Sequence, residues 1–307
     1  MERLPSLTAL RAFDAAARHL SFTQAAAELF VTPAAISHQI KNLEGELEVS
    51  LFVRHTRSLT LTEAGRLLAP AARDAFQGLA AAAGQVRRLG KEQPLTVSVA
   101  PSFGAKWLIP RLNRFHRRWP GTDIRIDASQ ALVDYGEAGV DIGVRYGTGK
   151  YPGLVAERLL GDEVFPVCSP GHLAEGPALE NPADLIRHVL LHDEMARWFD
   201  PNVPDWQNWL AAAGVADGES ARGEYFSQST FAYQAAIDGQ GVLLAKGVLV
   251  ENDLAAGRLV RLFDVALPVT YAYYLVYPRS ALADERIAAF RAWVLDEVAA
   301  GRDNGAT

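Results

Sequence analysis

The stretch SFTQAAAELFVTPAAISHQIKNLE, from Ser21 to Glu44, contains two helix starts in close succession. Ser21 followed by Gln24 has the Ser-x-x-Gln form of a capping box, which satisfies two free amides at the beginning of a helix. Thr32 followed by Pro33 is a second start, because threonine is a good N-cap and proline is tolerated at the first helical position. The stretch therefore predicts a helix, a tight turn and another helix.

The second of these helices has a narrow apolar stripe and a polar face opposite to it. The stripe recurs at helical spacing and consists of Ile36, Ile40, Leu43 and Leu47. The other face is rich in hydrogen-bonding groups and carries Ala34, Ser37, His38, Lys41 and Asn42. A preceding helix offers the inner face Leu7, Leu10, Phe13, Ala17 and Leu20. This pattern predicts a helix-turn-helix whose last helix enters the DNA major groove, and a three-helix bundle with a solvated polar face is the alternative.

The segment SLFVRHTRSLTLTEAG predicts a short β-hairpin directly after these helices. Its turn carries Arg57 and is flanked by Arg54, so it resembles a wing that grips phosphate while the helix contacts bases. The net charge of this region does not itself support DNA binding. Residues 1–60 hold six basic and six acidic side chains, whereas DNA-binding domains are usually basic. What matters is placement, since most of these acids lie late on their helices.

Residues 4–65, including LRAFDAAARHLSFTQAAAELFVTPAAISHQIKNLE, resemble the N-terminal domain of LysR-type transcriptional regulators. The likeness continues through LTVSVAPSFGAKWLIPRL, VDIGVRYGTGKYPGL, QAAIDGQGVLLA and AGRLVRLF to about residue 299. These later motifs resemble the branch that contains the activator of the glycine-cleavage operon. Several long motifs in the right order, over nearly the whole chain, carry the resemblance.

The chain departs from the pattern of that family at two positions. The family commonly has Thr-Gln at the start of the recognition helix, whereas this chain has Thr32-Pro33 and so lacks one polar side chain that could touch DNA. The family usually has Leu-Gly before the wing, whereas this chain has Leu47-Glu48. If that position needs a positive φ, glutamate costs about 1 kcal/mol there.

The resemblance implies an α/β multidomain protein with a winged helix-turn-helix, a long linker helix and a periplasmic-binding-protein-like effector domain of two α/β subdomains. The expected ranges are 1–61 for the winged helix-turn-helix, 62–89 for the linker and dimerisation helix, 90–94 for a hinge, 95–163 plus 268–299 for subdomain I, 164–267 for subdomain II and 300–307 for a tail. Apart from the resemblance, strand-like and helix-like segments alternate after the hinge, which favours parallel α/β sheets.

The expected linker helix has a broad stripe of small and apolar residues from Leu67 to Val86. A lone helix of this length needs a partner to bury such a stripe. Packing on its own chain is one option. An antiparallel pair between two subunits is the other, and the resemblance favours it, together with a tetramer. Two subunits would place two recognition helices on two half-sites of an inverted repeat.

Two strand-to-helix junctions in the effector part are candidate ligand sites. Each places hydroxyls at a helix start, which suits a carboxylate or another anion; alternatively each serine is an ordinary N-cap. The resemblance also assigns residues to the walls of the cleft between the subdomains. One of them, Asp134, can pair with an ammonium group, so an amino acid-like ligand is reasonable. The candidate effector-binding residues are Ser102, Phe103, Ser129, Asp134, Tyr146, Phe226, Ser227 and Ser229.

Composition sets further bounds on the class of protein. No apolar run reaches the roughly 20 residues that cross a bilayer, and the beginning of the chain lacks the apolar stretch of a signal peptide. Cys168 stands alone, so no intramolecular disulfide is expected. His188 and His192 lack the glutamate of an HExxH motif. No catalytic arrangement, metal site or cofactor is indicated. The whole chain carries −6 and residues 1–90 carry +2, which leaves −8 for the remainder.

We therefore expect a cytoplasmic, non-enzymatic, sequence-specific regulator that binds double-stranded DNA and responds to a small metabolite. RNA polymerase is a further possible partner, and no membrane partner is expected. The expected DNA-contacting residues are Thr32, Pro33, Ala34, Ser37, His38, Lys41, Arg54 and Arg57. A cytosolic solute-binding protein or enzyme that shares the cleft fold is the alternative, but it leaves the capped helix pair, the wing and the long helix without a purpose.

Overall fold

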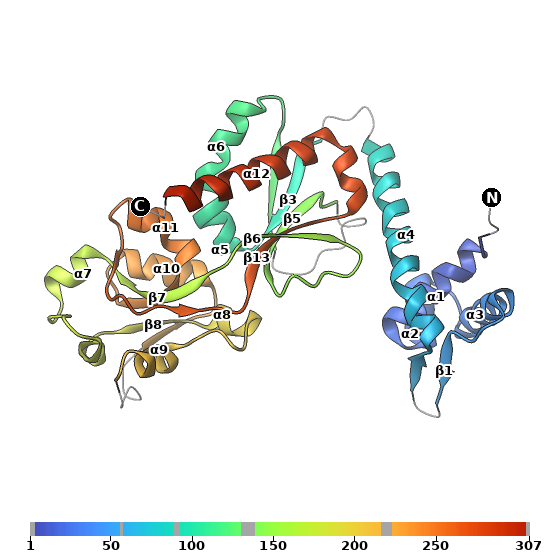
Figure 1. The fold of residues 1–307 in the computed structure, drawn as a ribbon, viewed down its shortest axis with the longest axis horizontal. Helices are drawn as coiled ribbons and strands as arrows, with labels where there is room; N and C mark the ends of the chain where they lie inside the picture. The colour runs from blue at the N-terminus through green and yellow to red at the C-terminus, as the bar shows by residue number, and fades with distance from the viewer. Residues whose placement is uncertain (1–3, 56–57, 89–92, 130–138, 216–222, 305–307) are drawn as a thin grey trace. The chain divides into compact units, whose positions relative to one another are not determined.

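The structure is a computed structural model that describes residues 4–55, 58–88, 93–129, 139–215 and 223–304 (Figure 1). The chain divides into two compact units, of which the first holds residues 1–90 and the second holds most of the remainder. Each unit is described by itself. Among the helices of the described ranges, none combines the length and the apolarity that crossing a membrane requires.

The first unit, drawn in blue to cyan in Figure 1, is a winged helix-turn-helix followed by a long helix. Its elements are α1 (Leu7–His19), α2 (Phe22–Leu29), α3 (Pro33–Leu47), the antiparallel strands β1 (Phe52–Arg54) and β2 (Leu59–Leu61), and α4 (Glu63–Arg88). The three helices bury a small core that contains Phe13, Ile36, Ile40 and Leu43. Phe52 of the wing packs on Phe13 with 5.6 Å between ring centroids, which joins the hairpin to this core.

The two helix starts predicted from the sequence are confirmed. The Ser21 hydroxyl accepts a hydrogen bond from the Gln24 amide at 3.3 Å, and the Thr32 hydroxyl accepts one from the Ala35 amide at 3.2 Å. Helix α3 ends at a residue with a positive φ, and that residue is Glu48, with φ 56°. The position at which the family usually has glycine therefore does require the left-handed conformation, and glutamate adopts it here at a cost of about 1 kcal/mol.

Three leucines that the helical pattern assigned to the core are instead exposed. Leu7 is 59% exposed, Leu20 is 46% exposed, and Leu47 also lies at the surface. Leu7 and Leu47 are the terminal residues of their helices, and Leu20 is the left-handed cap of α1. Apart from Phe13, the face of α1 that meets the core is made of small residues, which let the helices approach closely: Ala9, Ala12, Ala15 and Ala16.

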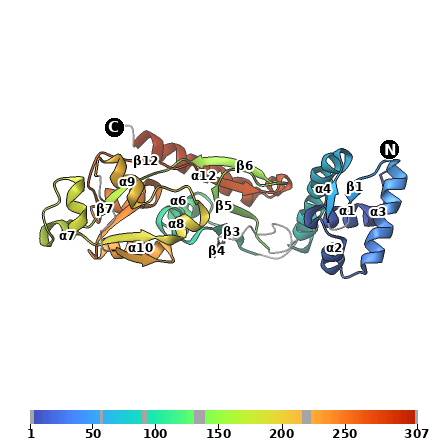
Figure 2. The ribbon, with the colours of Figure 1, turned by 90° about the horizontal axis from the view of Figure 1, so that it is seen from below.

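The second unit contains a five-stranded sheet in the order β4-β3-β5-β13-β6. Its strands are β3 (Leu95–Val99), β4 (Ile124–Ala128), β5 (Ile142–Gly147), β6 (Val155–Leu160) and β13 (Ala272–Tyr277). A helical run covers it, made of α5 (Pro101–Phe103), a π-turn (Gly104–Leu108) and α6 (Ile109–Arg118), together with α12 (Glu285–Asn304). Helix α12 runs alongside β6 in both views (Figures 1 and 2) and packs on α6 through Phe115 and Phe290.

The other sheet of this unit has the order β11-β7-β10-β8-β9, with β12 beside β7. Its strands are β7 (Glu163–Cys168), β8 (Leu190–Asp193), β9 (Gly223–Phe226), β10 (Val242–Lys246), β11 (Val260–Arg261) and β12 (Leu267–Pro268). Its helices are α7 (Pro170–Glu175), α8 (Glu194–Phe199), α9 (Trp206–Ala212), α10 (Ser229–Ile237) and α11 (Gly247–Ala255), with a 3₁₀ turn at Pro182–Arg187.

Both sheets are mixed, so the expectation of parallel sheets was wrong in part. In the first sheet β4, β3 and β5 are parallel, whereas β13 is antiparallel to both β5 and β6. In the second sheet β10, β8 and β9 are parallel, whereas β7 is antiparallel to β10. The antiparallel strands are the ones by which the chain crosses between the sheets. Strand β13 returns from the second sheet to the first, as the sequence indicated.

Candidate DNA-binding surface and effector site

The polar face of α3 projects outward from the first unit. Beneath it Ile36, Ile40 and Leu43 are buried, which fixes the rotation of the helix about its own axis. The predicted contact residues at its start and along its outer face, Thr32, Pro33, Ala34, His38 and Lys41, are exposed, and Ser37 is half-buried. Pro33 is the first helical residue and Thr32 caps it. Thr32, Pro33 and Ala34 therefore lie at the beginning of α3, and His38 and Lys41 follow further along the helix.

Arg54 connects the wing to this surface. Its guanidinium donates a hydrogen bond to the Ser37 hydroxyl at 3.4 Å and lies 5.0 Å from the ring centroid of Phe22. The side chain remains exposed, so it is held beside α3 while its charge still faces solvent. The predicted partner of Arg54 in the wing, Arg57, lies outside the described residues.

A carboxylate that the sequence analysis counted among the late helix acids holds the wing against α3. The Glu44 carboxylate accepts hydrogen bonds from the backbone amides of Leu51 at 2.7 Å and Phe52 at 3.3 Å. Without this acceptor those amides at the beginning of the hairpin would lose their partner. No feature of the sequence distinguishes Glu44 from Glu46 or Glu48, because its role depends on where the hairpin returns.

The predicted effector residues of the first sheet differ from one another in burial and in position. Ser102 is buried at the start of the helical run after β3, and Ser129 directly follows β4. Phe103 is fully buried, with its ring between those of Trp107 and Tyr273. Asp134 lies outside the described residues. At this junction the N-cap position is Ala100, so Ser102 is not the N-cap that the alternative interpretation required.

The second junction follows β9, where Phe226 is half-buried and Ser227 is exposed. Ser229 is buried, and its hydroxyl donates a hydrogen bond to Asp193 at 2.9 Å. The N-cap of α10 is Gln228, which makes no side-chain cap bond. The N-cap alternative is therefore wrong for Ser229 as well. Its hydroxyl instead orients a carboxylate that the sequence analysis had not singled out.

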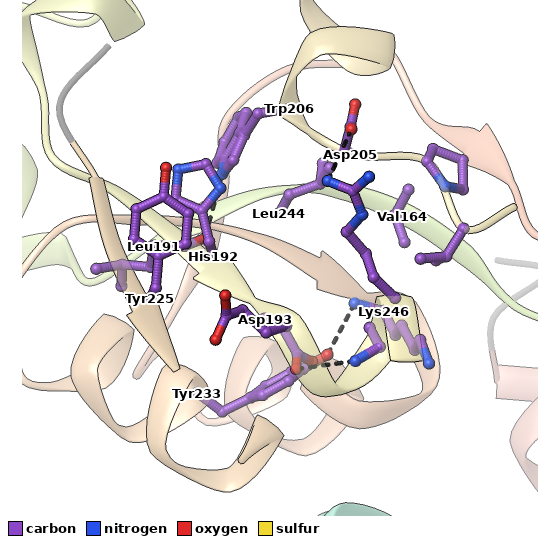
Figure 3. Close-up of a pocket in the computed structure, with 15 residues that line it drawn as sticks. Val164, Leu191, His192, Asp193, Asp205, Trp206, Tyr225, Tyr233, Leu244 and Lys246 are labelled. Atoms are coloured by element: carbon purple, nitrogen blue, oxygen red, sulfur yellow. Dashed lines mark hydrogen bonds and ion pairs between the residues drawn. The ribbon is translucent and has the colours of Figure 1, made fainter. Parts of the chain in front are cut away.

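Asp193 and Lys246 line a cavity of about 290 Å³ in the second sheet's half of the unit (Figure 3). Asp193 is the last residue of β8 and Lys246 the last residue of β10. Ligands of open α/β sheets bind at the carboxyl ends of strands, so these terminal positions were a usable signal. Figure 3 shows Asp193, Tyr233 and Lys246 together on one side of the cavity, with aromatic rings on the other.

The aromatic side of the cavity is formed by His192, Tyr225 and Trp206. The rings of His192 and Tyr225 are stacked, with centroids 4.3 Å apart. The Trp206 indole N–H donates to the Leu191 carbonyl at 3.1 Å, which fixes this ring in the wall. Burial lowers the pKa of His192. In the described part of the chain, no three His, Cys, Asp or Glu side chains are grouped so as to hold a metal ion.

The groups around Lys246 come from both halves of the unit. Its ammonium lies 3.7 Å from the ring centroid of Tyr146 on β5, so one sheet presents a cation to an aromatic face of the other. Burial lowers the pKa of Lys246, and the charges of Asp162, Asp193 and Asp200 partly oppose this effect. Burial also raises the pKa of Asp162 to about 6.

A winged helix-turn-helix joined by a long helix to two α/β sheets with a polar cavity defines a class of DNA-binding regulators that carry a ligand-binding domain. Residues 7–66 match the model of the bacterial regulatory helix-turn-helix protein, lysR family, and residues 89–299 match that of the LysR substrate binding domain. The chain belongs to the LysR family of transcriptional regulators. The predicted family and fold are thereby confirmed.

Relatives of known function are similar along almost the whole chain. The chain is 44% identical over 302 residues to the glycine cleavage system transcriptional activator of Escherichia coli K12, covering 98% of this chain and 97% of that protein. It is 37% identical to the HTH-type transcriptional activator AmpR of Pseudomonas aeruginosa, over 95% and 96% of the two chains.

Solved structures of the family are also similar to this chain. The effector domain of AmpR from Pseudomonas aeruginosa matches 70% of this chain and all of that one, with a TM-score of 0.56 and 29% identity. CrgA, a LysR-type transcriptional regulator from Neisseria meningitidis, matches 96% and 99% of the two chains, with a TM-score of 0.52 and 25% identity.

Proposed function

We propose that this LysR-type regulator binds an inverted-repeat operator by placing the beginning of α3 in the major groove. The observation that carries the proposal is the orientation of α3, with Ile36, Ile40 and Leu43 buried while His38 and Lys41 face solvent. Ser37, His38 and Lys41 contact bases or nearby phosphates, and Pro33 and Ala34 approach the DNA with them. Thr32, Arg54 and Arg57 anchor the phosphate backbone.

Self-association supplies the second recognition helix that an inverted repeat needs. Helix α4 exposes two large apolar side chains, with Leu67 79% and Leu79 56% exposed. Pairing of α4 with its counterpart in a second subunit would remove this apolar surface from water. A dimer formed in this way reads two half-sites, and two dimers make the tetramer that the family resemblance favours.

A small metabolite, such as an amino acid or a small anion, binds between the two effector subdomains and changes the angle between them. The proposed contacts include Ser102, Phe103, Ser129, Asp134, Tyr146, Phe226, Ser227 and Ser229. The ligand acts because it binds one arrangement better than the other. In the oligomer this re-spaces the DNA-binding pairs and alters DNA bending and access for RNA polymerase. The protein works in the cytoplasm, where its DNA lies, without catalysing a reaction.

The strand arrangement supports the proposed division of the chain. The winged helix-turn-helix is placed at 1–61, the linker helix at 62–89 and the hinge at 90–94. Subdomain I comprises 95–163 and 268–299, and subdomain II comprises 164–267, with 300–307 as a tail. The boundaries at 163 and 267 fall at β7 and within β12, where the chain passes between the sheets.

Footprinting on the promoter upstream of the protein's own gene tests the DNA-binding proposal. We expect protection of a dyad whose two half-sites are about one helical turn or a multiple of it apart. Lys41→Ala should weaken this protection, whereas Lys150→Ala, a matched change at an exposed turn of the effector unit, should leave it intact. Protection without dyad symmetry, or equal footprints for both variants, would contradict the proposed surface.

A separate change tests the effector part. Ser102→Glu adds a negative charge at a buried position, so it should abolish the transcriptional response to the metabolite while leaving operator affinity largely intact. Reporter activity measures the former and a mobility-shift titration the latter. A variant that kept its full response would remove Ser102 from the proposed site.

A further inference from the structure

The buried ammonium of Lys246 is an incomplete polar site. The side chain is 8% exposed and lines the cavity. Lys106 of the same unit forms an ion pair of 3.0 Å with Asp253, whereas no carboxylate oxygen of the described residues lies within 4.0 Å of the Lys246 ammonium, whose near contact is the Tyr146 ring. A buried charge without hydrogen-bonding counter-groups is costly, so this ammonium is placed to receive an acceptor.

Polar atoms around Lys246 also lack partners. The Tyr146 hydroxyl and the second carboxylate oxygens of Asp162 and Asp200 are shielded from solvent, and no hydrogen-bond partner for them occurs among the described residues. Asp193, in the cavity wall, uses one oxygen to accept from both Ser229 and the Ala196 amide. Donors and acceptors are therefore both left open, and buried polar atoms without a partner destabilise a folded protein.

The balance of charge limits what can fill the site. Three carboxylates line the cavity, those of Asp193, Glu194 and Asp205, against two cations, Lys246 and Arg197. A bare anion would suit Lys246 but would join an excess of negative charge. A bare cation would suit the carboxylates but would leave the Lys246 ammonium unmatched. A molecule that carries both charges close together satisfies both sets.

We propose that the effector is an α-amino acid zwitterion in this cavity, with its carboxylate on Lys246 and its ammonium on Asp193. This inference rests on the proposed function and names the ligand class and two charged contacts. Both contacts line the cavity, whereas the described residues expected from the sequence do not line it, although Ser229 donates a hydrogen bond to Asp193. A volume of about 290 Å³ is near the lower end of small-molecule sites, which begin at about 300 Å³. The stacked rings of His192 and Tyr225, with Trp206 beside them, favour an apolar side chain.

Three probes that share a carbon skeleton test the two charges separately. L-Alanine carries both groups, propionate lacks the ammonium and ethylamine lacks the carboxylate. Titration calorimetry and thermal unfolding of the full chain, at equal ionic strength, should show binding and a raised midpoint with L-alanine alone. L-Leucine should bind more tightly than L-alanine, because its side chain reaches the aromatic side of the cavity.

Two substitutions assign the charges to residues. Lys246→Met removes the cation at nearly constant volume, and Asp193→Asn keeps the acceptor oxygen that Ser229 and Ala196 use. Each should weaken L-leucine binding by roughly thirtyfold or more. Lys150→Met, the same chemical change at an exposed turn, should leave the affinity unchanged. Circular dichroism and the unfolding midpoint without probe verify that the variants are folded.

If propionate binds as tightly as L-alanine, the proposal of a zwitterionic ligand is wrong and the cavity is an anion site. If ethylamine binds as tightly as L-alanine, the proposal is also wrong and the cavity is a cation site. Unchanged L-leucine affinity in both folded variants would remove Lys246 and Asp193 from the site. Absence of binding for every amino acid tested would also overturn the inference, and a dyad footprint from the same preparation would show that the proposed function stands without it.

Discussion

The two units of the chain place their functional groups in opposite ways. In the first unit the groups proposed to meet DNA lie on the outside of α3, and an apolar core beneath them sets their direction. In the second unit the two charged residues proposed to meet a ligand, Asp193 and Lys246, line a cavity at the ends of strands that are far apart in the sequence.

This difference extends to how polar groups are satisfied. Arg18 of the first unit pairs with Asp14 and Glu28 at the surface, and His19 joins the same carboxylate of Glu28. The first unit also buries two polar atoms without a hydrogen-bond partner, Asp14 Oδ1 and Arg73 Nε, but these form an ion pair of 3.7 Å with each other. The effector unit keeps polar atoms of Tyr146 and Asp200 buried without a hydrogen-bond partner among the described residues. A surface that meets DNA can be complete before the DNA arrives, whereas a cavity that senses a ligand has groups that are completed when it binds.

The largest effect is expected from a substitution that disrupts the core beneath the exposed face of α3 in the first unit. Ile40→Asp places a carboxylate at a fully buried position, which should cost about 3–5 kcal/mol and unfold the winged helix-turn-helix. Operator binding should be lost, while the amino acid titration of the effector unit is retained. Loss of both would show that the units do not fold separately, and retention of both would contradict the assigned core.

A second test uses the opposite pH dependence of two carboxylates. The hydrogen bond from Arg18 lowers the pKa of Glu28 in the first unit. Its contribution is present above about pH 4.5 and is lost as the pH falls through the lowered value. Burial raises the pKa of Asp162 from 3.8 to about 6. The effector unit should therefore lose stability as the pH rises from about 4 to about 6, by at most about 3 kcal/mol.

Asp162→Asn checks that assignment. Asparagine keeps the oxygen that accepts from the Val248 and Glu163 amides, but it does not titrate. Denaturant unfolding of the variant between pH 4 and 7 should lose the downward slope of the effector transition, while Asp264→Asn at an exposed position should preserve it. A slope that survives Asp162→Asn belongs to another group.

A smaller effect is expected for the wing. Arg54→Ala removes one charge held beside α3 by Ser37 and Phe22. We expect weaker binding to all DNA sequences and a salt dependence that is shallower by about one unit. Fluorescence anisotropy at several salt concentrations measures both, with Arg11→Ala on α1 as the matched control. Loss of affinity at a single base position would assign Arg54 to base recognition instead.

The smallest expected effect concerns the backbone between α3 and the wing. Glu48→Gly relieves a positive φ of 56° and should stabilise the first unit by about 0.5–1 kcal/mol. Glu46→Gly, two residues earlier in the helical part of α3, should destabilise it by about 1 kcal/mol. Chemical denaturation of both variants gives the comparison, and changes of the same sign would show that the conformation of Glu48 carries no strain.

The sequence by itself determined the DNA-binding half to a large extent. The caps at Ser21 and Thr32, the buried stripe from Ile36 to Leu43 and the left-handed residue at Glu48 could all be predicted. Each depends on side chains within a few positions along one helix, where the period of the backbone decides which residues share a face. The prediction of a buried stripe was wrong at its last residue, Leu47, because the core does not extend to the last turn of the helix.

The tertiary structure alone decided the cavity and the way the wing is held. Asp193 and Lys246 are separated by more than fifty residues, and they line one cavity because parallel strands β8 and β10 end at the same edge of a sheet. Glu44 holds the hairpin only because the chain turns back onto α3. Such contacts depend on the path of the chain between elements, and local periodicity carries no information about that path.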